Sequence, residues 1–264
     1  MIKLVATDID GTILGGDFEF KPSVKDCIKN LQDKGIKIVL VTGRMHCAAT
    51  KIAEELGITT PIVSYQGGLI KEINNRCDTL YQSDVNSNTA KSIIQWARKN
   101  NVHINLYMND VLYVEEDNET IQRYTKARYI DYKVCSFDDL EIKNVNKILG
   151  IDFNNADRVT NWVNELKEKH PNLYIVKSTP YFCEIAENTA TKGCAVEFLQ
   201  NLWGIKKEET LAIGDQDNDI ELLKSAGIKI AMGNASDALK QYADYITDHV
   251  DEDGWVKALE KYCL

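Results

Sequence analysis

Two carboxylates stand close together directly after the first apolar run of the chain. Asp8 and Asp10 follow Leu4-Val5-Ala6-Thr7, are separated by one residue, and are followed by Gly11. A short apolar run bounded by turn signals is typical of a strand buried on both faces. Ligands of open α/β sheets bind beyond the carboxyl ends of such strands, so both carboxylates are expected at a binding crevice. Taken alone, these residues also fit an ordinary Asp-Gly turn.

Three other segments place polar groups at the same predicted crevice. Thr42 and Gly43 follow a second apolar run, Asp215 to Asp219 follow a later one, and Lys192 lies near the start of a helix predicted over 190–202. The Thr42 hydroxyl and the Gly43 backbone N–H, expected at a helix N-terminus, would form an anion site. Carboxylate oxygens from Asp8, Asp10 and Asp215 would suit Mg²⁺, a hard cation that bridges to phosphate.

These groups together predict a phosphate site in which a carboxylate is the nucleophile. A carboxylate that attacks a phosphate dianion is repelled by it. Mg²⁺, Lys192 and backbone N–H groups would offset the repulsion and stabilise the charge on the equatorial oxygens. A second carboxyl must protonate the leaving alcohol and later activate water, and Asp10 is placed to do so.

The elements that must position these groups follow an α/β rhythm at both ends of the chain. Strand-like runs at 2–7, 36–41 and 61–65 alternate with helical patterns at 22–34 and 45–56. This order predicts a doubly wound parallel sheet, a Rossmann-like fold, because parallel strands need crossover helices.

The middle of the chain differs. Alternating runs around Asn109-Asp110 indicate a hairpin, and further strand pairs with interspersed helices indicate an α+β domain. We therefore predict a core formed by residues 1–81 and 188–264, with an inserted cap at 82–187.

The chain resembles the haloacid dehalogenase superfamily of phosphatases, in the Cof-type branch with a large α/β cap. Four motifs match in order and together are far more specific than any one of them. They are Asp8-Ile9-Asp10-Gly11-Thr12, Val41-Thr42-Gly43-Arg44, Thr191-Lys192-Gly193 and Gly214-Asp215-Gln216-Asp217-Asn218-Asp219. The turn Tyr65-Gln66-Gly67-Gly68 departs from the Tyr-Asn-Gly common in this branch.

The resemblance implies a role for each motif residue. Asp8 would be the nucleophile that forms an aspartyl-phosphate and also a ligand of Mg²⁺. Asp10 would be the general acid and base and give its backbone carbonyl to the metal. Asp215 would bind the metal, and Asp219 would bind it through water or support the loop. Four residues would hold the phosphoryl group: Thr42, Gly43, Lys192 and Asn218.

The expected activity is Mg²⁺-dependent hydrolysis of a small phosphomonoester, such as a sugar phosphate or a related metabolite. One alternative is a phosphomutase-type phosphotransferase that passes the phosphoryl group to a sugar hydroxyl. The other is a non-catalytic phosphometabolite sensor, because a fold does not imply a function. The presence of Asp8, Asp10, Lys192 and Asp215 argues against a sensor, which has no need of a nucleophile and an acid/base.

The composition of the chain limits the classes of partner that it is expected to bind. The net charge of the 264 residues is -9, which argues against a nucleic-acid partner but leaves room for a small anion. The seven cysteines contain no C-x-x-C pair, which favours reduced thiols in the cytoplasm. The sequence shows no signal peptide pattern and no apolar run of membrane-spanning length, so we expect no membrane partner. No pattern indicates an obligate protein partner.

Overall fold

The computed structural model describes residues 1–16, 19–73, 78–126 and 130–264. Contacts among these residues divide the chain into two units. Unit 1 comprises Met1–Tyr81 and Thr191–Leu264, and unit 2 comprises Gln82–Ala190. The second unit is therefore an insertion into the first, and its later junction lies at Ala190, where the sequence analysis places it at 187. A role of unit 2 as a cap remains a prediction.

Unit 1 contains a five-stranded parallel sheet with the order β14-β13-β12-β1-β2. Its central strand β1 lies between β12 and β2, and all four residues of β1 are buried. This burial explains the uninterrupted apolar run of the sequence, because such a strand has no solvent-facing side. The strands are β1 (Leu4–Thr7), β2 (Lys37–Leu40), β12 (Thr210–Gly214), β13 (Ile228–Ala231) and β14 (Tyr245–Ile246).

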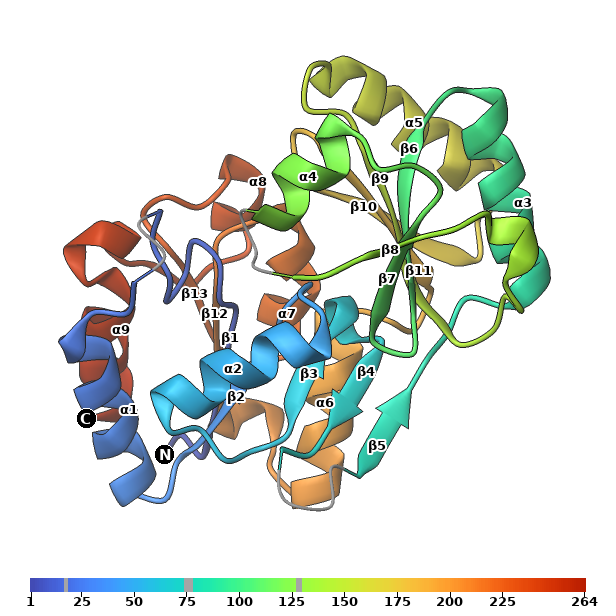
Figure 1. Ribbon diagram of the computed structural model, residues 1–264. Helices are drawn as coiled ribbons and strands as arrows, with labels where there is room; N and C mark the ends of the chain where they lie inside the picture. Colours follow the sequence, from blue (N-terminus) through green and yellow to red (C-terminus); the bar gives the residue numbers. More distant parts are fainter. Residues whose placement is uncertain (17–18, 74–77, 127–129) are drawn as a thin grey trace. The chain divides into compact units, whose positions relative to one another are not determined.

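Helices lie on both sides of this sheet (Figure 1). Helices α1 and α9 pack together on one side, and α6 and α7 pack together on the other. Their apolar faces and the strands form one continuous hydrophobic cluster. The helices of unit 1 are α1 (Pro22–Asp33), α2 (His46–Leu56), α6 (Lys192–Trp203), α7 (Ile220–Lys224), α8 (Asp237–Lys240) and α9 (Gly254–Cys263). The doubly wound α/β fold predicted from the sequence is confirmed.

One strand differs from its predicted place. The run at 61–65 forms β3 (Ile62–Ser64), which among the described residues is joined to the central sheet through a single parallel bridge from Val63 to Val41. Its main partner is β4 (Leu69–Lys71), which runs antiparallel to it in a separate sheet with β5 (Thr79–Gln82). The tight turn after β3 returns the chain at once, so the strand is too short to extend the parallel ladder.

Unit 2 is built on a six-stranded sheet with the order β10-β11-β9-β6-β7-β8. Helices α3 and α5 share a hydrophobic cluster with this sheet. The Tyr124 hydroxyl of α4 accepts a hydrogen bond of 2.8 Å from Tyr107, which lies on β6 outside that cluster. The strands are β6 (His103–Met108), β7 (Val111–Val114), β8 (Lys133–Val134), β9 (Val145–Ile151), β10 (Leu173–Thr179) and β11 (Phe182–Glu187). The helices are α3 (Ser87–Lys99), α4 (Glu119–Lys126) and α5 (Ala156–Lys169).

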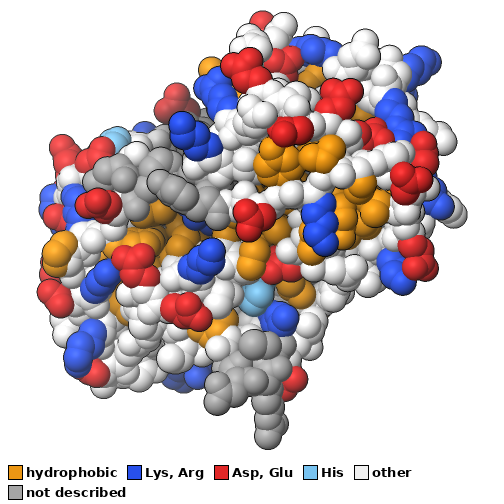
Figure 2. All heavy atoms as spheres, viewed as in Figure 1, with side chains coloured by type: hydrophobic (Ala, Val, Ile, Leu, Met, Phe, Trp, Pro, Cys, Tyr) orange, Lys and Arg blue, Asp and Glu red, His pale blue; other side chains and the backbone are white. Residues whose placement is uncertain are grey.

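The surface and the thiols bear on the predicted partners. On the face drawn in Figure 2, Lys and Arg side chains are interspersed with Asp and Glu side chains, so this face gives no support to a nucleic-acid partner. Within the described ranges, no helix is both long and apolar enough to cross a bilayer. The six described cysteines are free thiols, and Cys77 lies outside the described residues.

Candidate active site

Four charged side chains from distant parts of the sequence meet at the carboxyl ends of β1 and β12. The Lys192 ammonium donates to Asp8 Oδ1 at 2.6 Å and to Asp219 Oδ1 at 2.5 Å. One carboxylate oxygen from each of Asp8, Asp215 and Asp219 lies within 4.8 Å of the others. Lys192 is 1% exposed and Asp219 is fully buried. The structure thus brings together four residues that the sequence analysis singled out.

Sheet register and helix capping place these groups. Thr7 is paired with Ile213 across the parallel ladder, so the residues that follow β1 and β12 leave the sheet side by side. Helix α6 begins at Lys192, and the Thr191 hydroxyl caps it by accepting a hydrogen bond of 3.1 Å from the Cys194 N–H. The predicted start of this helix, at residue 190, was two residues early.

The acidic loop is held by its own hydrogen bonds. Asp219 Oδ2 accepts from the backbone N–H groups of Asp215 at 3.0 Å and Gln216 at 3.1 Å. Asp215 in turn accepts from the Thr12 hydroxyl at 3.1 Å and from the Gln216 amide at 2.9 Å. Both oxygens of Asp219 are therefore occupied, whereas Asp8 Oδ2 accepts no hydrogen bond from the described residues.

Burial of like charges dominates the electrostatics. Desolvation raises the pKa of Asp8 well above its usual value, and nearby carboxylates add to the shift while Lys192 opposes it. Desolvation, followed by repulsion from Asp219, raises the pKa of Asp215 to about 7. Burial disfavours the charged form of Lys192, but Asp219 and Asp8 more than offset it, so the pKa of Lys192 is raised. The site is thus short of positive charge.

A divalent cation fits this donor set. Three carboxyl groups face one ammonium group, so full ionisation would leave two negative charges uncompensated in a buried site. Uncompensated buried charge is strongly unfavourable. Carboxylate oxygens are the ligands that Mg²⁺ and Ca²⁺ prefer, and Mg²⁺ commonly uses one or two carboxylates together with water and phosphate. Asp8 and Asp215 could supply those oxygens.

Asp10 lies apart from the buried cluster. Its carboxylate forms a two-pronged ion pair with Arg44, whose Nε donates to Asp10 Oδ2 at 2.8 Å. The Asp10 side chain is 51% exposed, in contrast to the buried Asp8. The two carboxylates of the first motif therefore occupy different environments.

The predicted anion loop lies ahead of a helix rather than in its first turn. Helix α2 begins at His46, one residue after its predicted start, so Thr42 and Gly43 lie four and three residues before its first residue. The chain makes a bend first, in which the Thr42 hydroxyl accepts from the Arg44 N–H at 3.1 Å. Asn218 joins this region through Gln66, because its Nδ2 donates to Gln66 Oε1 at 3.0 Å.

The sequence analysis did not predict the contacts that three residues of the site make: Thr12, Arg44 and Gln66. Thr12 and Arg44 stand inside the quoted motifs, so their positions were visible but their partners, Asp215 and Asp10, were not. Gln66 stood out only as a departure from the family pattern.

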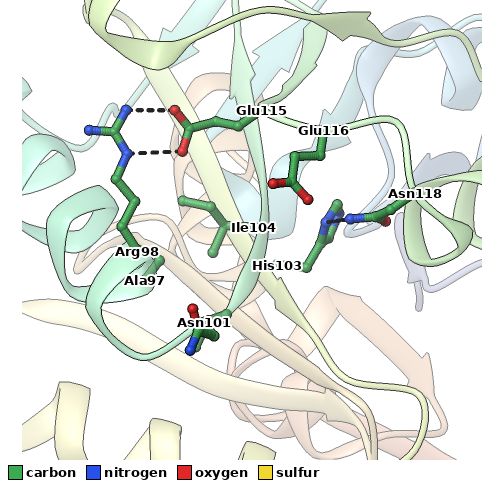
Figure 3. Close-up of a pocket in the computed structure, with 9 residues that line it drawn as sticks. Ala97, Arg98, Asn101, His103, Ile104, Glu115, Glu116 and Asn118 are labelled. Atoms are coloured by element: carbon green, nitrogen blue, oxygen red, sulfur yellow. Dashed lines mark hydrogen bonds and ion pairs between the residues drawn. The ribbon is translucent and has the colours of Figure 1, made fainter.

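Unit 2 holds a separate cavity of about 360 Å³. Figure 3 shows two interacting pairs among the polar groups that line it. Arg98 forms two parallel hydrogen bonds with Glu115, and the Asn118 amide lies 3.2 Å from His103 Nδ1. The predicted site residues all belong to unit 1, so this cavity is not the site that the motifs indicate.

Comparisons with known proteins agree with one another. The family described as haloacid dehalogenase-like hydrolase matches residues 5–259. The chain is 28% identical over 281 residues to phosphatase YwpJ of Bacillus subtilis, covering 96% of this chain and 97% of the relative. It is 29% identical over 263 residues to the 5-amino-6-(5-phospho-D-ribitylamino)uracil phosphatase YcsE of the same species, covering 100% and 96%. The crystal structure of a haloacid dehalogenase-like hydrolase from Bacteroides thetaiotaomicron is 28% identical, with a TM-score of 0.87 and 99% of both chains covered.

Proposed function

The chain belongs to the haloacid dehalogenase-like hydrolases and is a phosphatase of small phosphorylated substrates, and we propose that it works with Mg²⁺ through an aspartyl-phosphate on Asp8. The resemblance inferred from the motifs is thereby confirmed. The observation that carries the proposal is the buried Lys192 ammonium between Asp8 and Asp219. A lysine held between two carboxylates fixes one of them in position and supplies positive charge where a phosphate dianion must approach.

In the first step, Asp8 attacks the phosphorus atom and the bond to the leaving oxygen breaks. Oδ2 of Asp8 suits this role because Oδ1 is held by Lys192. Asp10 gives a proton to the leaving alcohol oxygen. Thr42, Gly43 and Asn218 orient the phosphoryl group.

In the second step, Asp10 takes a proton from water, and the water oxygen attacks the phosphorus of the aspartyl-phosphate. The acyl-phosphate bond breaks, which releases phosphate and restores the Asp8 carboxylate. The exposed position of the Asp10 carboxylate supports this role, since an acid/base must exchange protons between steps.

Asp8 and Asp215 would hold Mg²⁺, which when bound would neutralise charge on the phosphoryl oxygens. Asp219 would support the acidic loop and Lys192, with which it makes three hydrogen bonds. Asp10 would add its backbone carbonyl.

The substrate class is a small phosphomonoester, such as a sugar phosphate or a related metabolite. The curated relatives include phosphatases named for 5-amino-6-(5-phospho-D-ribitylamino)uracil and for phosphoglycolate. Both compounds are phosphate esters of small polar alcohols, so a test panel begins with them and with sugar phosphates. We include a cytoplasmic location in the proposal, which the free thiols support.

The test is phosphate release from that panel with Mg²⁺, by the natural chain and by Asp8→Asn. The variant keeps the shape of the side chain but cannot attack, so turnover should vanish while the circular dichroism spectrum is retained. EDTA should abolish turnover and added Mg²⁺ restore it. Persistent activity of Asp8→Asn would refute the mechanism. Reaction in ¹⁸O-labelled water identifies hydrolysis, because a phosphomutase would place no solvent oxygen in its product.

A further inference from the structure

Gln66 lies in a turn that the rest of unit 1 holds in an uncommon conformation. Gln66 has a φ of 62° and Tyr65 a φ of 53°, both in the left-handed region that L side chains rarely adopt. The Gln66 N–H donates to the Thr42 carbonyl at 3.0 Å. A Cβ added at Gly67 would lie only 2.2 Å from the carbonyl oxygen of Thr191. The turn is therefore fixed between the loop after β2 and the start of α6.

The Gln66 side chain is fixed as well. It is 2% exposed, and its Oε1 accepts from Asn218 Nδ2 at 3.0 Å. Its Nε2 lies against Gly43, 2.4 Å from where a Cβ at that glycine would stand. Among the residues that the structure describes, Nε2 donates no hydrogen bond. Gln66 thus joins two predicted phosphate-binding residues and keeps one unused donor.

In the described part of the chain, the Asn218 side chain lacks a hydrogen-bond donor for its oxygen, whereas Gln66 has a donor without an acceptor. Its side chain is buried, with 8% of the residue exposed, and its Oδ1 has no hydrogen-bond partner among the described residues. A buried carbonyl oxygen without a partner is unfavourable. The phosphoryl oxygens of a phosphomonoester dianion cannot satisfy it, because they carry no proton and only accept hydrogen bonds.

We propose that Gln66 is a positioning residue that aims the Asn218 amide at the phosphoryl group. When phosphate binds, both amides turn by half a rotation, so that Gln66 Nε2 donates to Asn218 Oδ1 and Asn218 Nδ2 donates to phosphate. A half rotation exchanges the donor and the acceptor of a primary amide with little change in shape. The exchange gives the orphaned oxygen a partner and turns a donor toward the anion. This inference rests on the proposed function for the identity of the ligand.

The test compares binding of inorganic phosphate by calorimetry, in the presence of Mg²⁺, between the natural chain and two near-isosteric variants. Gln66→Met makes no hydrogen bond, and Gln66→Glu can only accept, which would hold Asn218 with its oxygen toward the anion. Each variant should weaken phosphate binding by about tenfold or more, as expected for one hydrogen bond to a charged group. The control Gln32→Met removes a glutamine outside the site, which donates to the Gly57 carbonyl, and should leave phosphate binding unchanged.

A double variant separates positioning from a general structural role. If Gln66 acts through Asn218, Gln66→Met combined with Asn218→Ala should bind phosphate no more weakly than Asn218→Ala alone. Unchanged phosphate binding by Gln66→Met, or additive losses in the double variant, would overturn the proposal. If Gln66→Met does not fold, phosphate binding is compared instead for Gln66→Glu, alone and combined with Asn218→Ala.

Turnover tests the proposed function, whereas phosphate binding tests the role of Gln66, so the two can fail independently of each other. A natural chain that binds phosphate but hydrolyses no phosphomonoester would refute the reaction and leave the role of Gln66 standing. A natural chain that binds no phosphate would overturn the assignment of Gln66 itself.

Discussion

Replacing Lys192 by methionine should destabilise the protein strongly, because the ammonium is the only cation within hydrogen-bond distance of Asp8 and Asp219 among the described residues. Lys192 is 1% exposed and contacts these carboxylates at 2.6 Å and 2.5 Å. Removing one partner of a buried ion pair typically costs about 3–5 kcal/mol, since the remaining charge is left buried and unpaired. Two carboxylates lose their partner here, so we expect a loss of about 4 kcal/mol in the free energy of unfolding.

The assay is urea unfolding in EDTA, followed by circular dichroism, so that no metal compensates for the lost charge. The matched control is Lys29→Met, which breaks the pair between Lys29 and Asp33, also 2.6 Å long but formed by largely exposed side chains. Exposed pairs contribute little, so the control should unfold like the natural chain. Because the two pairs have similar lengths, the comparison isolates burial as the cause.

A second substitution tests the charge argument directly. Adding Asp8→Asn to Lys192→Met removes one of the unpaired carboxylates, so the double variant should be more stable than Lys192→Met alone by about 1 kcal/mol or more. A loss below about 1 kcal/mol in the single variant would refute the reasoning, since it lies well under the cost of an unpaired buried charge. A double variant less stable than both single variants would refute it equally.

Two further perturbations test other parts of the chain. Gly11→Ala should reduce both turnover and stability, because its φ is +80° and the new Cβ would lie 2.3 Å from Asp215 Oδ2; Gly35→Ala, with a φ of +77° and open space around it, measures the backbone strain alone. Stability is measured by urea unfolding and turnover by phosphate release. Equal losses in the two variants would contradict the expected clash with Asp215. In unit 2, desolvation by burial lowers the pKa of His103 below 6.5, despite a hydrogen bond to Asn105. The unfolded chain therefore binds this proton first, so the contribution of His103 to stability is present above pH 6.5 and is lost as the pH falls through its folded pKa. An NMR titration with a midpoint at or above 6.5 would contradict this expectation.

The parts of the site that follow from strand order could be predicted from the sequence. Asp8 and Asp215 each follow an apolar strand, and parallel strands bring their carboxyl ends to one edge whatever the side chains do. Lys192 could be placed near a helix start because a helical pattern follows it in the sequence. The partners of Arg44 and Gln66 could not, because they depend on side-chain rotamers and on a tight left-handed turn that periodicity does not encode.

The separation of Asp8 from Asp10 supports the division of work between them. Alternation along a strand would put residues two apart on the same face. The strand ends at Thr7, however, and the chain turns through Gly11, so Asp8 stays buried against Lys192 while Asp10 reaches an exposed place beside Arg44. A nucleophile gains from a fixed position, because misplacement raises the barrier. An acid/base must meet the leaving oxygen, water and solvent protons in turn, and an exposed carboxylate can do so. The turn after β1 therefore gives two chemically identical carboxylates different environments, one buried and one exposed, which their different roles require.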